Sequence, residues 1–288
     1  MFKDPIKAML VAVLVVFCSV VFAVQSLWKH FPKRFELRTI VLEEQSTINI
    51  NLPITDNFID ELNVEIIAKD KLLPPEAPLY LFINSPGGLV EAGLRFIDVV
   101  TALKRKVHTI SLGSYSMAFI ISQMFNDRYL TPYGIMFSHS VSGGFSGQMP
   151  GSLESRFNFD RKRYDEVHKK VADRAGMSLG EYRDKILREL WLGSNDAIQS
   201  GFADEVVLVK CGSSMKGTTK RTVYAWGAKI DVEFAKCPLI VSPVKVSPMF
   251  KSSHLHDLTR DALISELLKK LANSPNRFYY NPYSVTGQ

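Results

Sequence analysis

Short apolar runs alternate with segments of helical spacing through most of this chain. LYLFIN at 79–84 and VHTISLG at 107–113 are compact runs rich in strand-forming residues, and each runs into a turn and then a helical pattern. Repeated strand–helix units of this kind predict an α/β fold with a parallel sheet. The expected helices cover residues 56–70, 89–104, 116–125, 152–175 and 178–190, and further short strands are expected in TIVLEE, TININ and EVVLVK.

The N-terminal part of the chain is different, because no charged residue occurs from Ala8 to Trp28. About 20 apolar residues are needed to cross the roughly 30 Å of a bilayer's hydrocarbon core, and this run has that length. A cleaved signal peptide is the alternative, since Val21 and Ala23 are small residues at the two positions that a signal peptidase reads. The length of the run and the interfacial Trp28 favour a retained anchor over 8–28 that contacts membrane lipid.

The orientation of this anchor is less well specified by the sequence. Several basic residues follow the apolar run, which by the positive-inside rule would keep the body in the cytoplasm. The very short, signal-like N-terminus argues for export instead, and we expect an extracytoplasmic body. The basic residues are Lys29, Lys33, Arg34 and Arg38.

Charge and cysteine content add one feature each. Residues 1–206 hold 23 lysines and arginines against 24 acidic residues, whereas residues 207–288 hold 12 against 5, so the basic character belongs to a C-terminal extension. A hairpin is expected at 221–235 and an amphipathic helix at 254–273. We expect this helix to pack on protein, and contact with lipid is the alternative.

Cys211 and Cys237 form no metal-binding pattern, and a disulfide between them would require an oxidising compartment.

Ser116 lies where the strand at 107–113 turns through Gly113 into an apolar helix. A serine at a helix N-terminus lies beside free backbone N–H groups, which suits a nucleophile, although Ser116 or Ser114 as a plain N-cap is the ordinary alternative. The loop Ser85-Pro86-Gly87-Gly88 also joins a strand to a helix, and its glycines let backbone amides approach a ligand.

His139 lies near the end of the strand-like YGIMFSHS and precedes a glycine-rich segment. A neutral imidazole at such a strand end would make a good general base for Ser116. His108, within a strand, and His168, on a polar helix, are weaker alternatives. We expect no metal and no cofactor, and no motif indicates binding to nucleic acid.

From about 48 to 208 the chain resembles the proteolytic subunit of the Clp protease, the ClpP family. The matching segments are FINSPGG with its helix, the turn and SM pair before the buried helix, the histidine followed by GGFSGQ, and the block ELWLGSNDAIQSGFADEV. The resemblance implies the ββα spiral that this family shares with crotonases. It divides the chain into an anchor and linker at 1–38, a peptidase domain at 39–208 and the basic extension at 209–288.

The resemblance also implies roles for individual residues. Ser116 would be the nucleophile and His139 the base of a Ser-His-acid triad, with the amides of Gly88 and Met117 as oxyanion donors. The segment from Gly143 to Gln148, including Gly144 and Phe145, would bind an extended peptide by strand addition. The long helix at 152–175 corresponds to the handle that joins two rings in the family, which indicates a homo-oligomer.

Three departures from the family pattern affect these expectations. Glu189 occupies the position of the catalytic Asp, with Asp184 and Asp196 as alternatives outside the motif position. Tyr115 puts a bulky ring directly before the nucleophile, where the family has small residues. The N-terminal loops that receive an unfoldase are replaced by the membrane segment, so partnership with a Clp-type ATPase is doubtful.

We therefore expect a membrane-anchored serine endopeptidase acting on polypeptides. A catalytically inactive scaffold or binding protein with the same fold is the alternative, suggested by Glu189 and Tyr115. A third hypothesis is an acyl-CoA enzyme of the crotonase type. This hypothesis does not explain why Ser116 and His139 would be paired.

Overall fold

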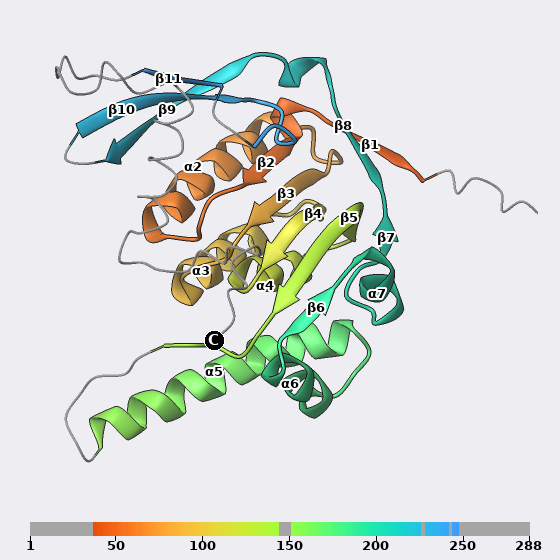
Figure 1. Ribbon diagram of the computed structural model, residues 1–288, viewed down its shortest axis with the longest axis vertical. Coiled ribbons are helices and arrows are strands. Elements are labelled where there is room, and N and C mark those ends of the chain that lie inside the picture. Colours follow the sequence, from red (N-terminus) through yellow and green to blue (C-terminus); the bar gives the residue numbers. More distant parts are fainter. Residues whose placement is uncertain (1–36, 144–150, 226–227, 242–243, 248–288) are drawn as a thin grey trace, which may run out of the picture. The chain divides into compact units, whose positions relative to one another are not determined.

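The computed structural model describes residues 37–143, 151–225, 228–241 and 244–247 (Figure 1). The chain divides into two compact units, Met1–Leu37 and Arg38–Gln288, and the elements below belong to the second. The predicted membrane span at 8–28 and the amphipathic helix at 254–273 lie outside the described residues. Within the described ranges, no helix combines the length and the apolar character that crossing a bilayer requires.

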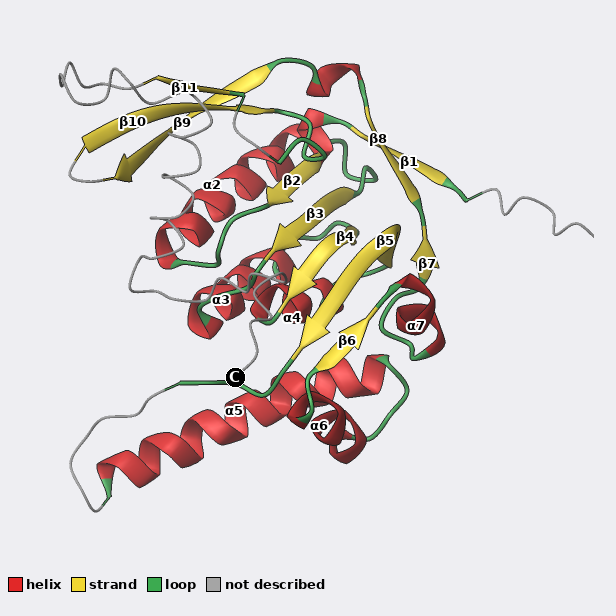
Figure 2. Ribbon diagram, viewed as in Figure 1, coloured by secondary structure: helices red, strands yellow, loops and turns green. Residues whose placement is uncertain are grey.

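Strands and helices alternate along the chain, as the hydrophobic pattern predicts (Figure 2). The strands are β1 (Thr39–Leu42), β2 (Thr47–Ile50), β3 (Leu79–Ser85), β4 (Val107–Tyr115), β5 (Arg128–Ser138), β6 (Leu190–Leu192), β7 (Glu205–Val206), β8 (Leu208–Cys211), β9 (Thr218–Ala225), β10 (Ala228–Ala235) and β11 (Lys245–Ser247). The helices are α2 (Asp56–Leu72), α3 (Val90–Thr101), α4 (Met117–Gln123), α5 (Ser152–Arg174), α6 (Leu179–Leu187) and α7 (Ser194–Gln199), with short 3₁₀ turns at Glu44–Ser46 and Ser213–Met215.

The central sheet has the strand order β2-β3-β4-β5-β6, and β7 pairs with the first half of β5. Strands β2 to β5 run parallel, whereas the short β6 is antiparallel to β5. The parallel strands confirm the predicted α/β class, because crossover helices are needed to join them. Their carboxyl ends consequently meet at one edge of the sheet.

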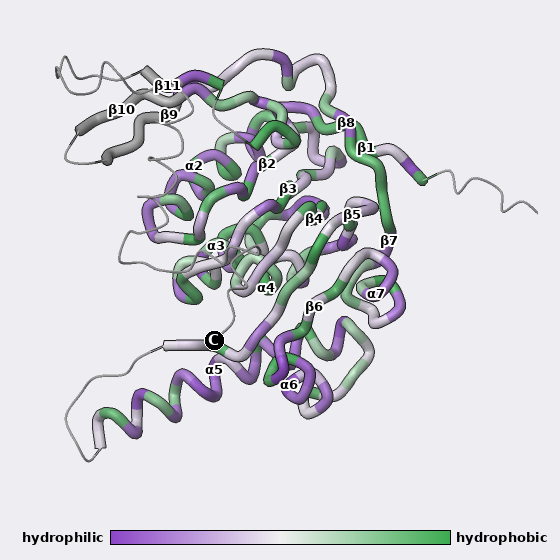
Figure 3. The backbone as a smooth tube through the Cα atoms, in the orientation of Figure 1, coloured by the Kyte–Doolittle hydropathy of each residue, from purple (hydrophilic) through white to green (hydrophobic). Residues whose placement is uncertain are grey.

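Two hydrophobic clusters hold this unit together. The larger one packs α2, α3 and α4 against the sheet, and every residue of α4 is buried. The smaller one lies under the parallel pair β1 and β8 and includes Leu42, Phe82 and Val207, all fully buried. α5 is mostly polar along its length, as Figure 3 shows, and only four of its residues are buried.

Some predicted boundaries were wrong by a few residues. The helix expected to reach residue 190 ends at Leu187, because Leu190 already pairs with Ser138 as part of β6. The single strand expected in EVVLVK is two strands, β7 and β8, which pair with β5 and β1 respectively and are separated by the fully buried Val207. Tertiary pairing, which local pattern does not encode, decided both boundaries.

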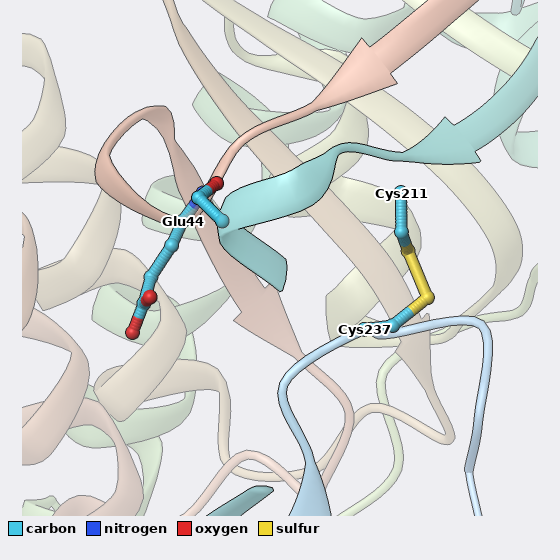
Figure 4. The surroundings of a disulfide bond; sticks show 4 residues. Glu44, Cys211 and Cys237 are labelled. Atoms are coloured by element: carbon cyan, nitrogen blue, oxygen red, sulfur yellow. A yellow bond between two sulfur atoms is a disulfide. The ribbon is translucent and has the colours of Figure 1, made fainter. Parts of the chain in front are cut away.

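The C-terminal extension begins as part of the folded body. The predicted hairpin forms between β9 and β10, and β11 pairs with β10. A disulfide joins Cys211 at the end of β8 to Cys237 after β10 (Figure 4). Lys236 donates to the Glu44 carboxylate at 2.8 Å, so the extension is joined to β8 by a covalent bond and to the turn after β1 by an ion pair.

Candidate active site

Three loops meet at the carboxyl edge of the sheet, and each carries a residue expected from the sequence. The Gly87-Gly88 loop follows β3, Ser116 follows β4, and His139 follows β5. Since these strands are adjacent and parallel, segments separated by 23 or more positions in sequence are brought side by side. Ligand sites of parallel α/β sheets typically lie at this edge.

Ser116 occupies a sharp turn between β4 and α4. Its φ of 54° and ψ of −121° lie outside the ordinary regions for a residue with a side chain, and its amide donates to the Phe137 carbonyl at 2.8 Å. Its side chain makes no capping hydrogen bond to the helix, so the plain N-cap alternative does not describe it. Such a strained strand–turn–helix junction costs about 1–3 kcal/mol and presents a serine hydroxyl above the sheet.

The side chains of Ser116 and His139 meet directly. Nε2 of His139 lies 2.9 Å from Oγ of Ser116, and both side chains are partly exposed. An imidazole nitrogen at this distance can accept the hydroxyl proton when it is the unprotonated tautomer. The pair expected from the sequence is therefore brought together.

The glycine loop packs under this turn. A Cβ on Gly87 would meet the Tyr115 carbonyl oxygen and would lie 2.8 Å from Cβ of Ser116, and its φ is +87°. A Cβ on Gly88 would meet the carbonyl of Ile54. The sequence analysis assigned a role to Gly88 and none to Gly87, the glycine of this loop that packs against Ser116.

The backbone amides of Gly88 and Met117 take no part in the hydrogen bonds of the neighbouring bridge and helix. The bridge between Ile54 and Gly88 uses the Gly87 carbonyl and the Leu89 amide, which leaves the Gly88 amide out of it. Met117 is the first residue of α4, where an amide has no partner within its own helix. Amides of this kind can donate to a developing oxyanion.

Glu189 is placed beside His139 by the sheet but points its carboxylate elsewhere. Ser138 pairs with Leu190 in the antiparallel β5–β6 ladder, so the next step sets His139 opposite Glu189. Glu189 is exposed, has a φ of 61°, and accepts a 3.4 Å hydrogen bond from Nε1 of Trp191. Within the described residues, no hydrogen bond joins the Glu189 carboxylate to His139.

The alternatives for the acid and base lie apart from this contact. Asp184 on α6 and Asp196 on α7 are exposed, and neither hydrogen-bonds to His139 in the part of the chain described. His108 lies within β4 beside Asp127, and His168 is buried on α5 against Tyr182. Burial lowers the pKa of both of these histidines, which favours their neutral forms.

Three aromatic rings lie next to the Ser116–His139 contact. Phe137 stacks on the His139 ring, with centroids 5.3 Å apart and planes at 17°. The ring of Trp191 also contacts Phe137, with centroids 4.2 Å apart. Tyr115 completes the group at 6.3 Å from Phe137, and burial raises the pKa of its phenol. The sequence offered no signal for this arrangement beyond the bulk of Tyr115, because it depends on strand register.

A buried hydrogen bond supports the strand end that carries His139. Oγ of Ser138 lies 2.8 Å from Oη of Tyr182, a residue of α6 that is fully buried. Burial raises the pKa of the Tyr182 phenol, which therefore stays protonated. This bond ties β5 to α6 one residue before the imidazole.

The expected peptide-binding segment is described only at its first residue. Gly143 is exposed and lies outside any strand, while Gly144 and Phe145 lie outside the described residues. Among the described side chains, no group of three or more His, Cys, Asp or Glu residues is arranged to hold a metal ion.

Comparison with known proteins identifies the family of this chain. The family model described as Clp protease matches residues 34–210, more than half of the chain. The ATP-dependent Clp protease proteolytic subunit of Streptococcus mutans is 28% identical over 162 residues, which cover 54% of this chain and 81% of that protein. The same subunit of Streptococcus suis is 26% identical over 159 residues with the same coverage, and proteolytic subunit 2 of Tropheryma whipplei is 28% identical over 155 residues, 51% of this chain and 84% of that protein.

The fold and the site thus define a mixed α/β protein with a serine and a histidine in contact at the carboxyl ends of neighbouring parallel strands. The chain belongs to the Clp protease family, and its body from 34 to 210 is a peptidase domain of that family.

Proposed function

We propose that this protein is a membrane-anchored serine endopeptidase in which Ser116 is the nucleophile and His139 the general base. The observation that carries the proposal is the 2.9 Å contact between Nε2 of His139 and Oγ of Ser116 at a strained turn. A serine hydroxyl needs an adjacent base to attack an amide carbonyl at neutral pH, and this contact supplies one.

The reaction would follow from the positions of these groups. Oγ of Ser116 attacks the scissile carbonyl while Nε2 of His139 takes its proton, and the amides of Gly88 and Met117 donate to the oxyanion. The imidazolium then gives the proton to the leaving amine, and water, activated by the same imidazole, releases the acyl group. Loss of one such amide donor typically lowers the rate by about 10²–10³.

Glu189 is proposed as the acidic member of the triad. It fills the position of the family's aspartate, and the β5–β6 register sets its backbone opposite His139. A carboxylate at this place stabilises the imidazolium that forms during acyl transfer. Because Glu is one methylene longer than Asp, its carboxylate is displaced by about 1.5 Å, and we expect a lower activity than an aspartate would give.

The substrates we propose are polypeptides bound as extended strands along Gly143, Gly144 and Phe145. The relatives are named as proteolytic subunits of an ATP-dependent Clp protease, which supports a polypeptide substrate and a homo-oligomer built from this chain. We do not propose a Clp-type ATPase partner, because the apolar segment at 8–28 replaces the family's N-terminal loops.

The apolar segment is proposed as a retained single-pass anchor with the body on the extracytoplasmic side. Its length matches a bilayer. The Cys211–Cys237 disulfide supports the orientation, since disulfides persist in oxidising compartments and are rare in the cytosol.

A fluorophosphonate probe, which reacts covalently with activated serines, tests the peptidase proposal on the full chain in membranes. We expect labelling of the wild type and none of Ser116→Ala or His139→Ala. Ser114→Ala is the matched control, because Ser114 lies two residues away with its side chain fully buried, and it should be labelled like the wild type. Labelling that persists in Ser116→Ala, or an unlabelled wild type, would count against the proposal.

An inactive scaffold is the second candidate, and one observation favours it. The Glu189 carboxylate contacts the Trp191 indole in this structure, and within the described residues it makes no hydrogen bond to His139. The proposed triad therefore lacks the contact between its acid and its base. An unlabelled wild type that still assembles into homo-oligomers would support this candidate.

A further inference from the structure

Three aromatic residues form a row across the sheet beside the proposed active site. Tyr115 on β4 pairs in register with Phe137 on β5, and Phe137 pairs with Trp191 on β6. Directly paired residues on neighbouring strands point to the same face of a sheet, so the three rings lie on one face. Tyr115 and Trp191 also contact each other, with centroids 6.2 Å apart in an edge-on arrangement.

His139 and Glu189 lie at the end of this row. His139 comes two residues after Phe137, directly beyond the end of β5, and Glu189 two residues before Trp191, directly before β6 begins. The Glu189 carboxylate contacts the Trp191 indole, so it also lies beside the rings. The His139 ring stacks on Phe137 with their planes at 17°. The row therefore lies directly against the imidazole that contacts Ser116.

The hydrogen bonds of His139 leave its orientation underdetermined. Within the described residues, its one hydrogen bond is the contact between Nε2 and Ser116. One bond at one nitrogen permits the ring to tilt and rotate about that contact, whereas a triad acid would fix the ring from the other nitrogen. Here the Glu189 carboxylate accepts from the Trp191 indole instead.

The ring of Phe137 is itself held in place from two sides. Trp191 contacts it at 4.2 Å and Tyr115 at 6.3 Å, and its own side chain is half-buried. Because rings contact Phe137 on two sides, its side chain has few alternative rotamers, and one face of its ring stays against the imidazole.

We propose that Phe137 is a positioning residue for His139, and that Trp191 acts with it by holding the Phe137 ring. In this arrangement the aromatic row supplies the orientation of the base, and Glu189 supplies the negative charge and anchors the Trp191 indole. The inference rests on the proposed function, because it assigns an orienting role within the same Ser116–His139 site.

The first test compares rates of fluorophosphonate labelling in the full chain. Phe137→Leu keeps an apolar side chain but removes the flat ring, and we expect labelling to slow by about tenfold or more, because small misplacements of a base are costly. Phe137→Tyr keeps the ring and should stay within about threefold of the wild type. Trp191→Leu should slow labelling in the same direction as Phe137→Leu.

Phe96→Leu is the matched control for stability. Phe96 is fully buried on α3, so the same substitution there weakens the core without touching the row. We expect Phe96→Leu to lower the thermal midpoint while its labelling rate stays near the wild-type value. If Phe137→Leu labels at the wild-type rate, or if its rate merely follows the loss of thermal midpoint that Phe96→Leu also shows, the positioning role is overturned.

A second readout does not depend on activity. In the wild type, the proton resonances of the His139 ring should lie upfield because the ring stacks on Phe137, and they should move downfield in Phe137→Leu; His139→Gln assigns the signals. If the wild type is not labelled at all, the proposed function fails. The chemical shift of the His139 ring protons then tests by itself whether the ring stacks on Phe137. A His139 signal that is the same in Phe137→Leu and in the wild type would overturn the inference while leaving a labelled serine peptidase intact.

Discussion

Ser116 and Glu189 are the non-glycine residues with positive φ in the described part of the chain, and both border the same site. A residue with a Cβ in this region loses roughly 1–2 kcal/mol relative to glycine. Strain of this kind persists where the surrounding structure over-determines the conformation. Here the adjoining β4–α4 turn and the α6–β6 junction impose it on Ser116 and Glu189 respectively.

Substitution of Glu189 should therefore separate stability from activity. Glu189→Gly relieves the strained backbone, and we expect the free energy of unfolding to rise by about 1 kcal/mol while fluorophosphonate labelling falls. Glu189→Gln keeps the strain but removes the charge, so it should lower labelling with little change in stability. Urea unfolding and labelling of the two variants check this, and a Glu189→Gly protein that labels at the wild-type rate would argue against the triad role.

The buried His168 should make the protein sensitive to mild acid. Burial lowers the pKa of His168 below its ordinary value of about 6.5, with Asp165 opposing and Arg183 reinforcing this effect. Protons then bind preferentially to the unfolded chain, so stability is fully present above about pH 6.5 and declines as the pH falls below it. The slope from one such group is at most about 1.4 kcal/mol per pH unit.

His168→Gln removes this titration while keeping a polar side chain against Tyr182. We expect its urea midpoint to change less between pH 7 and pH 5 than that of the wild type. Parallel changes in the two proteins would show that other groups, such as the similarly buried His108, account for the whole acid sensitivity.

At the scale of elements, the close packing of the β3–α3 loop under the β4–α4 turn sets the geometry of the site. Gly87→Ala would place a methyl group against the Tyr115 carbonyl and Cβ of Ser116. We expect it to lower stability by about 3 kcal/mol or more and to abolish labelling, because positive φ and overpacking both act there.

Gly176→Ala provides the comparison for this prediction. Gly176 has a φ of +71°, but a Cβ there would meet nothing within 4 Å. The strain alone should cost about 1–2 kcal/mol, and labelling should remain. Equal effects of the two substitutions on labelling would mean that the contact under Ser116 is unimportant.

The disulfide joins two elements of different parts of the chain, β8 and the segment after β10. It closes a loop between positions separated by 26 residues, which in the chain-entropy model stabilises the fold by about 3–4 kcal/mol. We expect a Cys211→Ser/Cys237→Ser variant to unfold at lower urea and to expose the β9–β10 hairpin to proteases first. An unchanged urea midpoint would show that the Lys236–Glu44 ion pair and local packing suffice.

At the scale of the whole molecule, the proposed anchor and its orientation can be tested together. Full-length protein should stay in the membrane pellet after alkaline extraction, whereas a chain beginning at residue 38, the start of the second compact unit, should be released. In intact cells the Cys211–Cys237 pair should resist alkylation until a reductant is added. A released full-length chain would argue against the anchor, and a reduced pair in cells would argue against the extracytoplasmic side.

The hydrophobic pattern alone determined most of the elements of the body. Strands β3 and β4 and helices α2 and α5 were predicted within a few residues, because the two-residue and 3.6-residue periods are local properties of the chain. The turn at Ser116 and the glycine loop before α3 were also predicted, since both rest on short strand–turn–helix signals. The resemblance to the Clp protease family then indicated which serine and which histidine would meet.

Tertiary structure decided the features that depend on register and long-range pairing. The stack of Phe137 on His139, the row that continues to Trp191, and the turning of Glu189 towards the indole all arise from how β4, β5 and β6 align. The same holds for Gly87 under Ser116 and for the Cys211–Cys237 bond, which brings β8 and the segment after β10 together. A local sequence pattern specifies which face a residue takes on its own strand, but the neighbours that it meets are fixed only when the strands pair.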